Sequence, residues 1–515
     1  MVWMVLLLIV LVLILYYIAT FKHDYWKKRG VPYLQPSLIF GNYRDFILMR
    51  KNLGEVAESI CKQFPDAPVV GTFYGTDPAL IVKDPELIKL ITTKDFYYFS
   101  GRENSDHINK EMLLKNLFSI YGDDWKVVRQ NLTSLFSTSK MKTMFYLVEK
   151  CTTQLDNLLE IETKTNDIQE VRNFISRFTM DCIGSCAFGV ETDAMGKDIN
   201  RNPFRAISDK IFDFSVSRTL KIIGRTMWPG IFYGLGYKLL PDDIERFFYN
   251  LLNGVFEKRN YEPTARNDFI DLILKFNKNK CITGDSMKTT KVKDEQTKVS
   301  VEVDKDFLVS QCFLFFTAGF ETTASTLSFT LYELAKNAKA QKLVMQEVDE
   351  YLRQHDGKLE YDCVSQLPYL DACVNEALRL YPILTLLTRE VSDDYTLPNG
   401  LRLEKKTRIH LPMLYIHKNP EYFPNHEEYR PERHLPDEKN NIKPCTLFPF
   451  GEGPRMCIGM RFAKMVMASC LVTFFRKYRV ELAEEMPSTV QLHPRYLGSQ
   501  SINGVKLKFL NRVPN

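Results

Sequence analysis

One cysteine in a glycine-rich loop constrains this chain more than any other feature. Residues 448–459 read Phe-Pro-Phe-Gly-Glu-Gly-Pro-Arg-Met-Cys-Ile-Gly, so Gly451, Gly453 and Gly459 surround Cys457. Apolar residues at helical spacing follow, which predicts that a helix begins just after the cysteine. Free N–H groups and the positive end of the helix dipole lower the pKa of a thiol at such a position. The sequence therefore predicts a thiolate that acts as a nucleophile or as a metal ligand, on a backbone that a bulky partner can approach closely.

The first 21 residues carry no charge and are nearly all apolar. A helix of that length spans about 31 Å, which matches the hydrocarbon core of a bilayer. Lys22, Lys27, Lys28 and Arg29 follow directly, and no basic residue precedes the span. By the positive-inside rule the N-terminus is lumenal and the remaining chain cytosolic. We predict that residues 1–21 are an uncleaved, single-pass transmembrane signal anchor; the alternative of a cleaved signal peptide lacks a basic start and a small-residue cleavage site.

The remaining chain divides into a linker and one large domain. Residues 22–44 are basic and contain several prolines and glycines, which predicts a stiff linker. Residues 45–515 are predicted to form a mainly α domain with small β-sheets (α+β), with amphipathic helices over 146–272. The polar stretch 277–303 is predicted to be a solvated surface loop. Strand-like runs lie at 69–74, 79–82, 408–411 and 504–509.

Composition excludes several classes of protein. The 68 basic and 63 acidic residues leave a net charge of +5, too small to indicate a nucleic-acid partner. Eleven cysteines without a C-x-x-C pair exclude a disulfide scaffold and argue against a zinc ribbon.

The cysteine loop supports a more specific interpretation. The pattern Phe450-x-x-Gly453-x-Arg455-x-Cys457-x-Gly459 resembles the haem-binding signature of the cytochrome P-450 superfamily. This resemblance implies the cytochrome P-450 fold, with haem b (iron protoporphyrin IX) as cofactor and the Cys457 thiolate as axial ligand of its iron. Loop N–H groups would hydrogen-bond the sulfur, and Arg455 would pair with a haem propionate.

A second motif lies within an apolar helical pattern over residues 311–326, where 318–322 read Ala-Gly-Phe-Glu-Thr. A glycine inside a helix costs about 1 kcal/mol, and a buried carboxylate costs more unless it is paired. The run resembles the long helix above the haem in that family. The resemblance implies that Glu321 and Thr322 guide protons to dioxygen at the haem, while Ala318 and Gly319 leave room for it.

A third motif has a structural role in the family. Glu376 and Arg379 are three residues apart and share one helix face. With Arg433 they resemble the Glu–Arg–Arg network that supports the haem loop. The family usually has Phe at the position of His434, and we expect this departure to affect only packing.

Two further patterns resemble propionate-binding residues: the W-x-x-x-R pair Trp125 and Arg129, and Arg389 after the third motif. The motifs follow the order of the family from end to end, so the resemblance covers nearly all 515 residues. Phrases around Cys182 and after Cys457 are similar to the insect-type microsomal branch.

The resemblance implies a membrane-bound monooxygenase of the endoplasmic reticulum that inserts one oxygen atom from O2 into a lipophilic xenobiotic, lipid or hormone. Electrons would come from NADPH through a separate NADPH-cytochrome P-450 reductase, because no nicotinamide-binding glycine motif is visible; cytochrome b5 is a further candidate partner, and membrane lipid is expected around the anchor. The substrate contacts predicted by analogy are Phe313, Phe316, Ile383, Leu384 and Leu387.

Two other functions stay open at this point. A haem-thiolate isomerase or dehydratase acting on a lipid peroxide needs no proton delivery, so Glu321 and Thr322 argue against it. A non-catalytic haem protein that binds a lipophile would not depend on a reductase.

Overall fold

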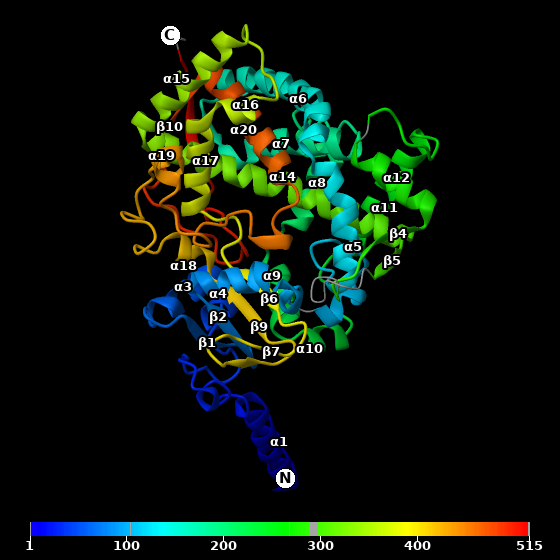
Figure 1. Ribbon diagram of the computed structural model, residues 1–515, viewed down its shortest axis with the longest axis vertical. Coiled ribbons are helices and arrows are strands. Elements are labelled where there is room, and N and C mark those ends of the chain that lie inside the picture. The colour runs from blue at the N-terminus through cyan, green and yellow to red at the C-terminus, as the bar shows by residue number, and fades with distance from the viewer. Residues whose placement is uncertain (1, 104, 197, 267, 289–296, 513–515) are drawn as a thin grey trace.

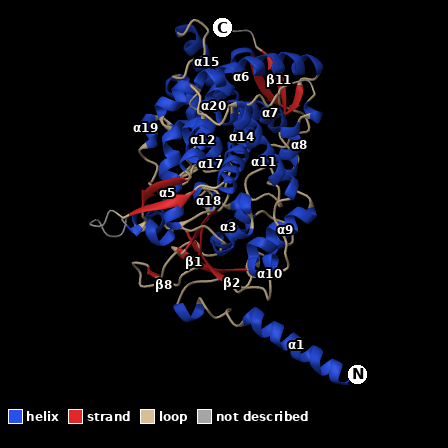
Figure 2. Cartoon of the chain, turned by 90° about the vertical axis from the view of Figure 1, so that its right-hand side faces the viewer, coloured by secondary structure: helices blue, strands red, loops and turns tan. Residues whose placement is uncertain are grey.

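The computed structural model describes residues 2–103, 105–196, 198–266, 268–288 and 297–512. Helix α1 (Val2–Thr20) projects from one end of a helical body (Figures 1 and 2). The helices of the body are α2 (Arg44–Ile47), α3 (Leu53–Lys62), α4 (Pro85–Lys89), α5 (Gly122–Thr133), α6 (Thr138–Thr165), α7 (Val171–Ile183), α8 (Pro203–Ile211), α9 (Val216–Met227), α10 (Pro229–Gly234), α11 (Asp242–Lys258), α12 (Phe269–Asn279), α14 (Lys305–Lys336), α15 (Ala338–Gln354), α16 (Cys363–Gln366), α17 (Pro368–Leu380), α18 (Met413–His417), α19 (Pro436–Lys439) and α20 (Met460–Lys477). The predicted helix-rich fold class is confirmed.

The strands form small, separate sheets. The largest has the order β1 (Val69–Tyr74), β2 (Asp77–Val82), β9 (Arg408–Leu411) and β6 (Leu387–Glu390), and it lies near the anchor in Figure 1. The second has the order β10 (Tyr478–Leu482), β11 (Lys506–Asn511) and β3 (Ile168–Glu170). The third and fourth are two-stranded, with β4 (Cys281–Asp285) paired to β5 (Lys298–Glu302) and β7 (Tyr395–Thr396) paired to β8 (Arg402–Leu403). All four predicted runs are strands, with shifts of two residues at the start of β2 and at both ends of β11.

Helix α14 is the centre of the main hydrophobic core. It packs against α7, α17, α11 and α20, and most of its 32 residues are buried. It is long and apolar enough to cross a membrane, but 72% of its most apolar window lies inside the body. Burial on nearly all sides explains why its apolar residues are not confined to one stripe. Helix α1 is the other candidate span, and only 6% of its window is buried.

The segment after the anchor packs onto the largest sheet. Trp26 is fully buried and donates from Nε1 to the carbonyl oxygen of Thr72 at 2.9 Å. A Cβ on Gly71 would overlap the Trp26 ring, so the glycine makes this contact possible. Tyr33 forms a parallel bridge to Gly71, and Tyr43 is also buried. The predicted linker is therefore held against the body at Trp26, Tyr33 and Tyr43, which restricts how the body can turn relative to α1.

The prediction of a loop over residues 277–303 is wrong for the described part. Strands β4 and β5 form a hairpin there, with Cys281 opposite Glu302. The hairpin lies against α5, where Gln130 donates to Asp285 and Asn131 donates to the carbonyl oxygen of Thr283. Lys291 and Lys293 of the predicted loop lie outside the described residues.

Candidate functional site

Cys457 lies in the loop before α20, as its sequence context predicts. The 3-10 turn Gly453–Arg455 precedes it, and α20 begins three residues later. Its backbone N–H donates to the carbonyl oxygen of Phe450 at 2.7 Å, which closes the loop. Nine of the eleven cysteines are buried; Cys457 and Cys281 are accessible. Cys457 thus combines a fixed backbone with an accessible sulfur.

The environment of this thiol differs from the prediction of a lowered pKa. Although Cys457 is exposed, the protein atoms packed around its thiol partly desolvate it and raise its pKa, whereas a hydrogen bond from the Gly459 N–H and the charge of Arg129 lower it. The desolvation raises the pKa more than the hydrogen bond and the charge of Arg129 lower it, so the protein alone favours the neutral thiol. Both opposing groups stabilise a negative sulfur, and a bound metal cation would add to them.

Gly453 holds the loop against the rest of the fold. Its φ is +71°, a left-handed conformation that favours glycine, and a Cβ there would overlap the carbonyl oxygen of Thr92. Gly459 has ordinary backbone angles, and a Cβ on it would meet nothing closer than the Phe136 ring at 3.8 Å. The packing of the chain therefore requires a glycine at residue 453, whereas the space beside Gly459 is open.

Four arginines gather beside the loop. Arg455 donates to three backbone carbonyl oxygens, at 2.6 Å to Ser100, 3.3 Å to Phe118 and 2.5 Å to Ile120. Burial lowers the pKa of Arg455, and the charges of the other three arginines lower it further. These three are Arg102, Arg389 and Arg129.

No carboxylate of the described residues forms an ion pair with any of these four guanidinium groups. Arg389 is fully buried, and its Nε and Nη2 have no hydrogen-bond partner among the described residues. Burial lowers the pKa of Arg389 to about 9 and that of Arg102 to about 10. Buried cations are normally paired, so this cluster fits a ligand that carries two or more negative charges. Sequence reasoning missed Arg102, since a single arginine in a loop has no local pattern.

The W-x-x-x-R pair on α5 belongs to the same cluster. The Trp125 ring is buried, with the guanidinium carbon of Arg455 4.7 Å from its centre. Burial lowers the pKa of Arg129, and its charge acts on Cys457. Residues from α5, β6 and the cysteine loop, far apart in the sequence, therefore meet at one place.

The predicted catalytic residues of α14 divide between two sides of the helix. Ala318 is exposed and Thr322 is half-buried, although the helix around them is buried. The Thr322 hydroxyl donates to the carbonyl oxygen of Ala318 at 2.8 Å. These two residues therefore face accessible space one helical turn apart.

Gly319 and Glu321 face the neighbouring helix α7 instead. A Cβ on Gly319 would lie 2.5 Å from Cδ1 of Ile183, so the glycine allows close packing against this side chain; its predicted role of leaving room for dioxygen stays a prediction. Glu321 is buried and accepts three hydrogen bonds from Arg172, at 2.7, 2.8 and 2.9 Å. Ser325 donates to the same carboxylate at 3.4 Å. Arg172 has no sequence signal, since 149 residues separate it from Glu321.

The third motif forms a buried ionic network. Both oxygens of Glu376 accept from Arg379, at 2.8 and 2.9 Å, and Arg433 forms an ion pair with Glu376 at 3.3 Å. His434 Nε2 lies 2.8 Å from the same carboxylate. Burial raises the pKa of Glu376, but the hydrogen bonds from His434 and Arg379 prevail and hold it at about 2. His434 is thus part of the network, where the sequence predicted an effect on packing only.

The predicted substrate contacts have different environments. Phe316 is fully buried among other aromatic rings, and Phe313 packs against Phe248. Leu387 is buried in the core of the largest sheet. Ile383 is almost buried, whereas Leu384 is 38% exposed. Among the five, Leu384 alone offers a large accessible apolar surface in this conformation.

Residues 31–509 match the family model described as Cytochrome P450. The chain belongs to the cytochrome P450 family. Cytochrome P450 6B2 of Helicoverpa armigera is 34% identical over 508 residues, covering 98% of this chain and 97% of that protein. Cytochrome P450 6k1 of Blattella germanica is 35% identical over 499 residues, covering 96% and 94%. Cytochrome P450 6B1 of Papilio polyxenes is 32% identical over 514 residues, covering 99% and 100%.

Membership fixes the class of enzyme. A cytochrome P450 is an oxidoreductase of the monooxygenase type that binds haem through a cysteine thiolate and draws on NADPH through a reductase. The predicted family, fold, enzyme class and cofactor are confirmed, and the matched relatives are insect proteins, as the resemblance to the insect-type branch implied.

Proposed function

We propose that this cytochrome P450 is a membrane-bound monooxygenase for a lipophilic substrate, with electrons supplied by a separate reductase. The substrate and O2 would be converted, with NADPH and one proton, to the hydroxylated product, water and NADP⁺. The observation that carries the proposal is the exposed Cys457 beside four arginines, two buried and two partly buried, that form no ion pair with a carboxylate of the described residues.

This site fits haem. Cys457 would ligate the iron, and the two propionates would pair with Arg102, Arg129, Arg389 and Arg455. Binding of two carboxylates would relieve the mutual repulsion that lowers the pKa of Arg455. Haem supplies the iron centre at which dioxygen is reduced; the protein supplies the thiolate, the propionate partners and the control of protons.

Proton control falls to α14 in this proposal. The Thr322 hydroxyl, held by the carbonyl oxygen of Ala318, can accept and pass on a proton at the accessible face of the helix. Glu321 can supply one only after its carboxylate leaves Arg172, because its present hydrogen bonds hold it on the α7 side. The hydrogen bonds to Arg172 therefore set the free-energy cost of moving the Glu321 carboxylate toward Thr322.

The membrane location rests on two apolar surfaces. Helix α1 has a mean hydropathy of 3.0 over its most apolar window and is followed by Lys22. A second exposed apolar surface lies over α9, α10 and the residues after them, formed by Val216, Leu220, Ile231, Leu235 and Tyr237. We propose a single-pass protein of the endoplasmic reticulum with a cytosolic catalytic domain, served by NADPH-cytochrome P450 reductase and cytochrome b5.

The test is turnover of isotope-labelled dioxygen. Membranes containing this chain, the reductase and NADPH would be given a panel of lipophiles, and the products analysed by mass spectrometry. We expect one labelled oxygen atom per product molecule and a strict need for NADPH. Product formed from a lipid peroxide without NADPH would favour the isomerase, and spectral binding of a lipophile without turnover would favour the non-catalytic protein.

A further inference from the structure

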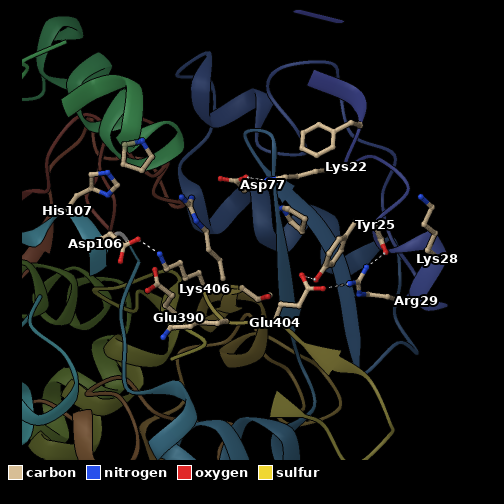
Figure 3. A pocket seen from close by; sticks show the side chains of 16 residues that line it. Lys22, Tyr25, Lys28, Arg29, Asp77, Asp106, His107, Glu390, Glu404 and Lys406 are labelled. Atoms are coloured by element: carbon tan, nitrogen blue, oxygen red, sulfur yellow. Dashed lines mark hydrogen bonds and ion pairs between the residues drawn. The ribbon is translucent and has the colours of Figure 1, made fainter. Parts of the chain in front are cut away.

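A cavity of about 610 Å³ lies where the anchor meets the body (Figure 3). It shares no residue with the cysteine site. Its lining comes from the end of the anchor, the β1–β2 turn, the segment around His107, the start of α10, Glu390 and the loop before β9. The lining residues are Phe21, Lys22, Tyr25, Lys28, Arg29, Asp77, Pro78, Asp106, His107, Pro229, Glu390, Glu404, Lys405, Lys406, Thr407 and Arg408.

The cavity lies level with the edge of the proposed bilayer. Helix α1 ends at Thr20, and Phe21 and Lys22 already line the cavity. Residues within one or two turns of the end of a span lie in the headgroup layer, outside the hydrocarbon core. On the other side, α10 begins with Pro229 and exposes Ile231. An amphiphile could therefore place its polar group in the cavity and keep its chains in the bilayer.

The charges of the lining favour an anion. Six basic side chains and four carboxylates line the cavity. Three of the carboxylates each have one basic partner: Lys22 with Asp77 at 2.6 Å, Arg29 with Glu404 at 2.7 Å, and Lys406 with Asp106. Within the described residues, neither Lys28 nor Lys405 forms an ion pair.

Part of the wall is held in place. The Arg29 guanidinium lies 3.6 Å from the centre of the Tyr25 ring, and Tyr25 donates its hydroxyl to Glu404 at 3.2 Å. This contact joins the segment after the anchor to the loop that carries Lys405. Lys28 and Lys405, which form no ion pair within the part of the chain that the structure describes, therefore lie on elements that are already tied together.

We propose that this cavity binds the phosphate-bearing headgroup of an anionic phospholipid, with Lys28 and Lys405 as its cationic contacts. The proposal rests on the proposed membrane location. Lysines near a membrane surface attract anionic lipid, and a cavity between two of them adds a defined place for one molecule. Bound there, the lipid would link the anchor to the sheet and restrict the tilt of the catalytic body.

The test uses the detergent-solubilised, haem-loaded full chain and native mass spectrometry. The probe is a short-chain, water-soluble phosphatidylserine, and inorganic phosphate is titrated as a competitor. The variant Lys28→Gln/Lys405→Gln neutralises both contacts. The control Lys27→Gln/Lys358→Gln removes the same charge at two exposed lysines outside the cavity.

We expect one retained lipid, at least tenfold weaker binding in the cavity variant, and near-normal binding in the control. Equally weakened lipid binding in both variants would overturn the proposal, because the net charge of the protein would then explain the loss without any role for the cavity. Displacement of the lipid by inorganic phosphate at similar concentration would overturn the commitment to a lipid. The thiolate spectrum and membrane fractionation are measured on the same proteins, so loss of haem or of the anchor is distinguished from failure of the cavity.

Discussion

The ionic network around Glu376 offers a direct test of how the fold supports the cysteine loop. The substitution Glu376→Gln keeps the size of the side chain and removes its charge. Arg379 and Arg433, both buried, then lose their only carboxylate among the described residues. We expect a large loss of stability, since removing one partner of a buried pair leaves the other charge uncompensated.

The magnitude follows from the pKa of Glu376, which is held at about 2 against an ordinary value of 4.5. At about 1.4 kcal/mol per pKa unit, this difference corresponds to about 3.5 kcal/mol of unfolding free energy. Because the folded-state pKa is lowered, this contribution is present above a pH of about 4.5 and is lost as the pH falls toward 2. The unfolding free energy lost through Glu376→Gln at neutral pH should therefore be about 3.5 kcal/mol, and this loss should shrink as the pH falls.

The assay is denaturant unfolding of the holoenzyme, followed by tryptophan fluorescence and by the haem absorbance. The control is Glu438→Gln, which removes a carboxylate from the half-exposed pair with Arg430 and should cost less than about 1 kcal/mol. Equal losses in the two variants would refute the reasoning. If Glu376→Gln does not fold, His434→Phe provides a milder test. It removes one hydrogen bond to the carboxylate and should cost about 1.5 kcal/mol.

Three further predictions concern the site. Thr322→Ala should retain haem but divert reducing equivalents to hydrogen peroxide, and product formed per NADPH at the wild-type ratio would contradict its proton role. Arg172→Gln should release Glu321 and change the solvent isotope effect on turnover, whereas a purely structural role would change stability alone. Gly453→Ala should lower haem content severalfold, because its Cβ would overlap the Thr92 carbonyl oxygen; normal haem content by absorbance would disprove this.

Local patterns predicted most of the fold. Strand β1 is a short run rich in β-branched and aromatic residues, and β9 alternates polar and apolar residues; both lie where the sequence predicts them. The β4–β5 hairpin was missed because lysines dominate the region, although Lys298–Glu302 alternates between exposed and half-buried side chains as a strand should.

The site was less predictable where it depends on distant contacts. Cys457 and its loop are one continuous motif, so the sequence shows them. Arg102 and Arg172 act through residues far away in the chain, and no local spacing marks them. Phe316 shows the opposite difficulty, because an apolar residue on a central helix has the same pattern whether it contacts a substrate or fills the core.

The role of Cys457 as the haem ligand is the central claim. The reduced, carbon-monoxide difference spectrum of the membrane-expressed chain tests it, with Cys457→Ala as the variant and Cys281→Ala, at the other accessible cysteine, as the control. We predict a strongly red-shifted Soret band for the wild type and the control, and its loss in Cys457→Ala. A Cys457→Ala protein that keeps the red-shifted band, or a folded wild type with the band of histidine-ligated haem, would contradict the account.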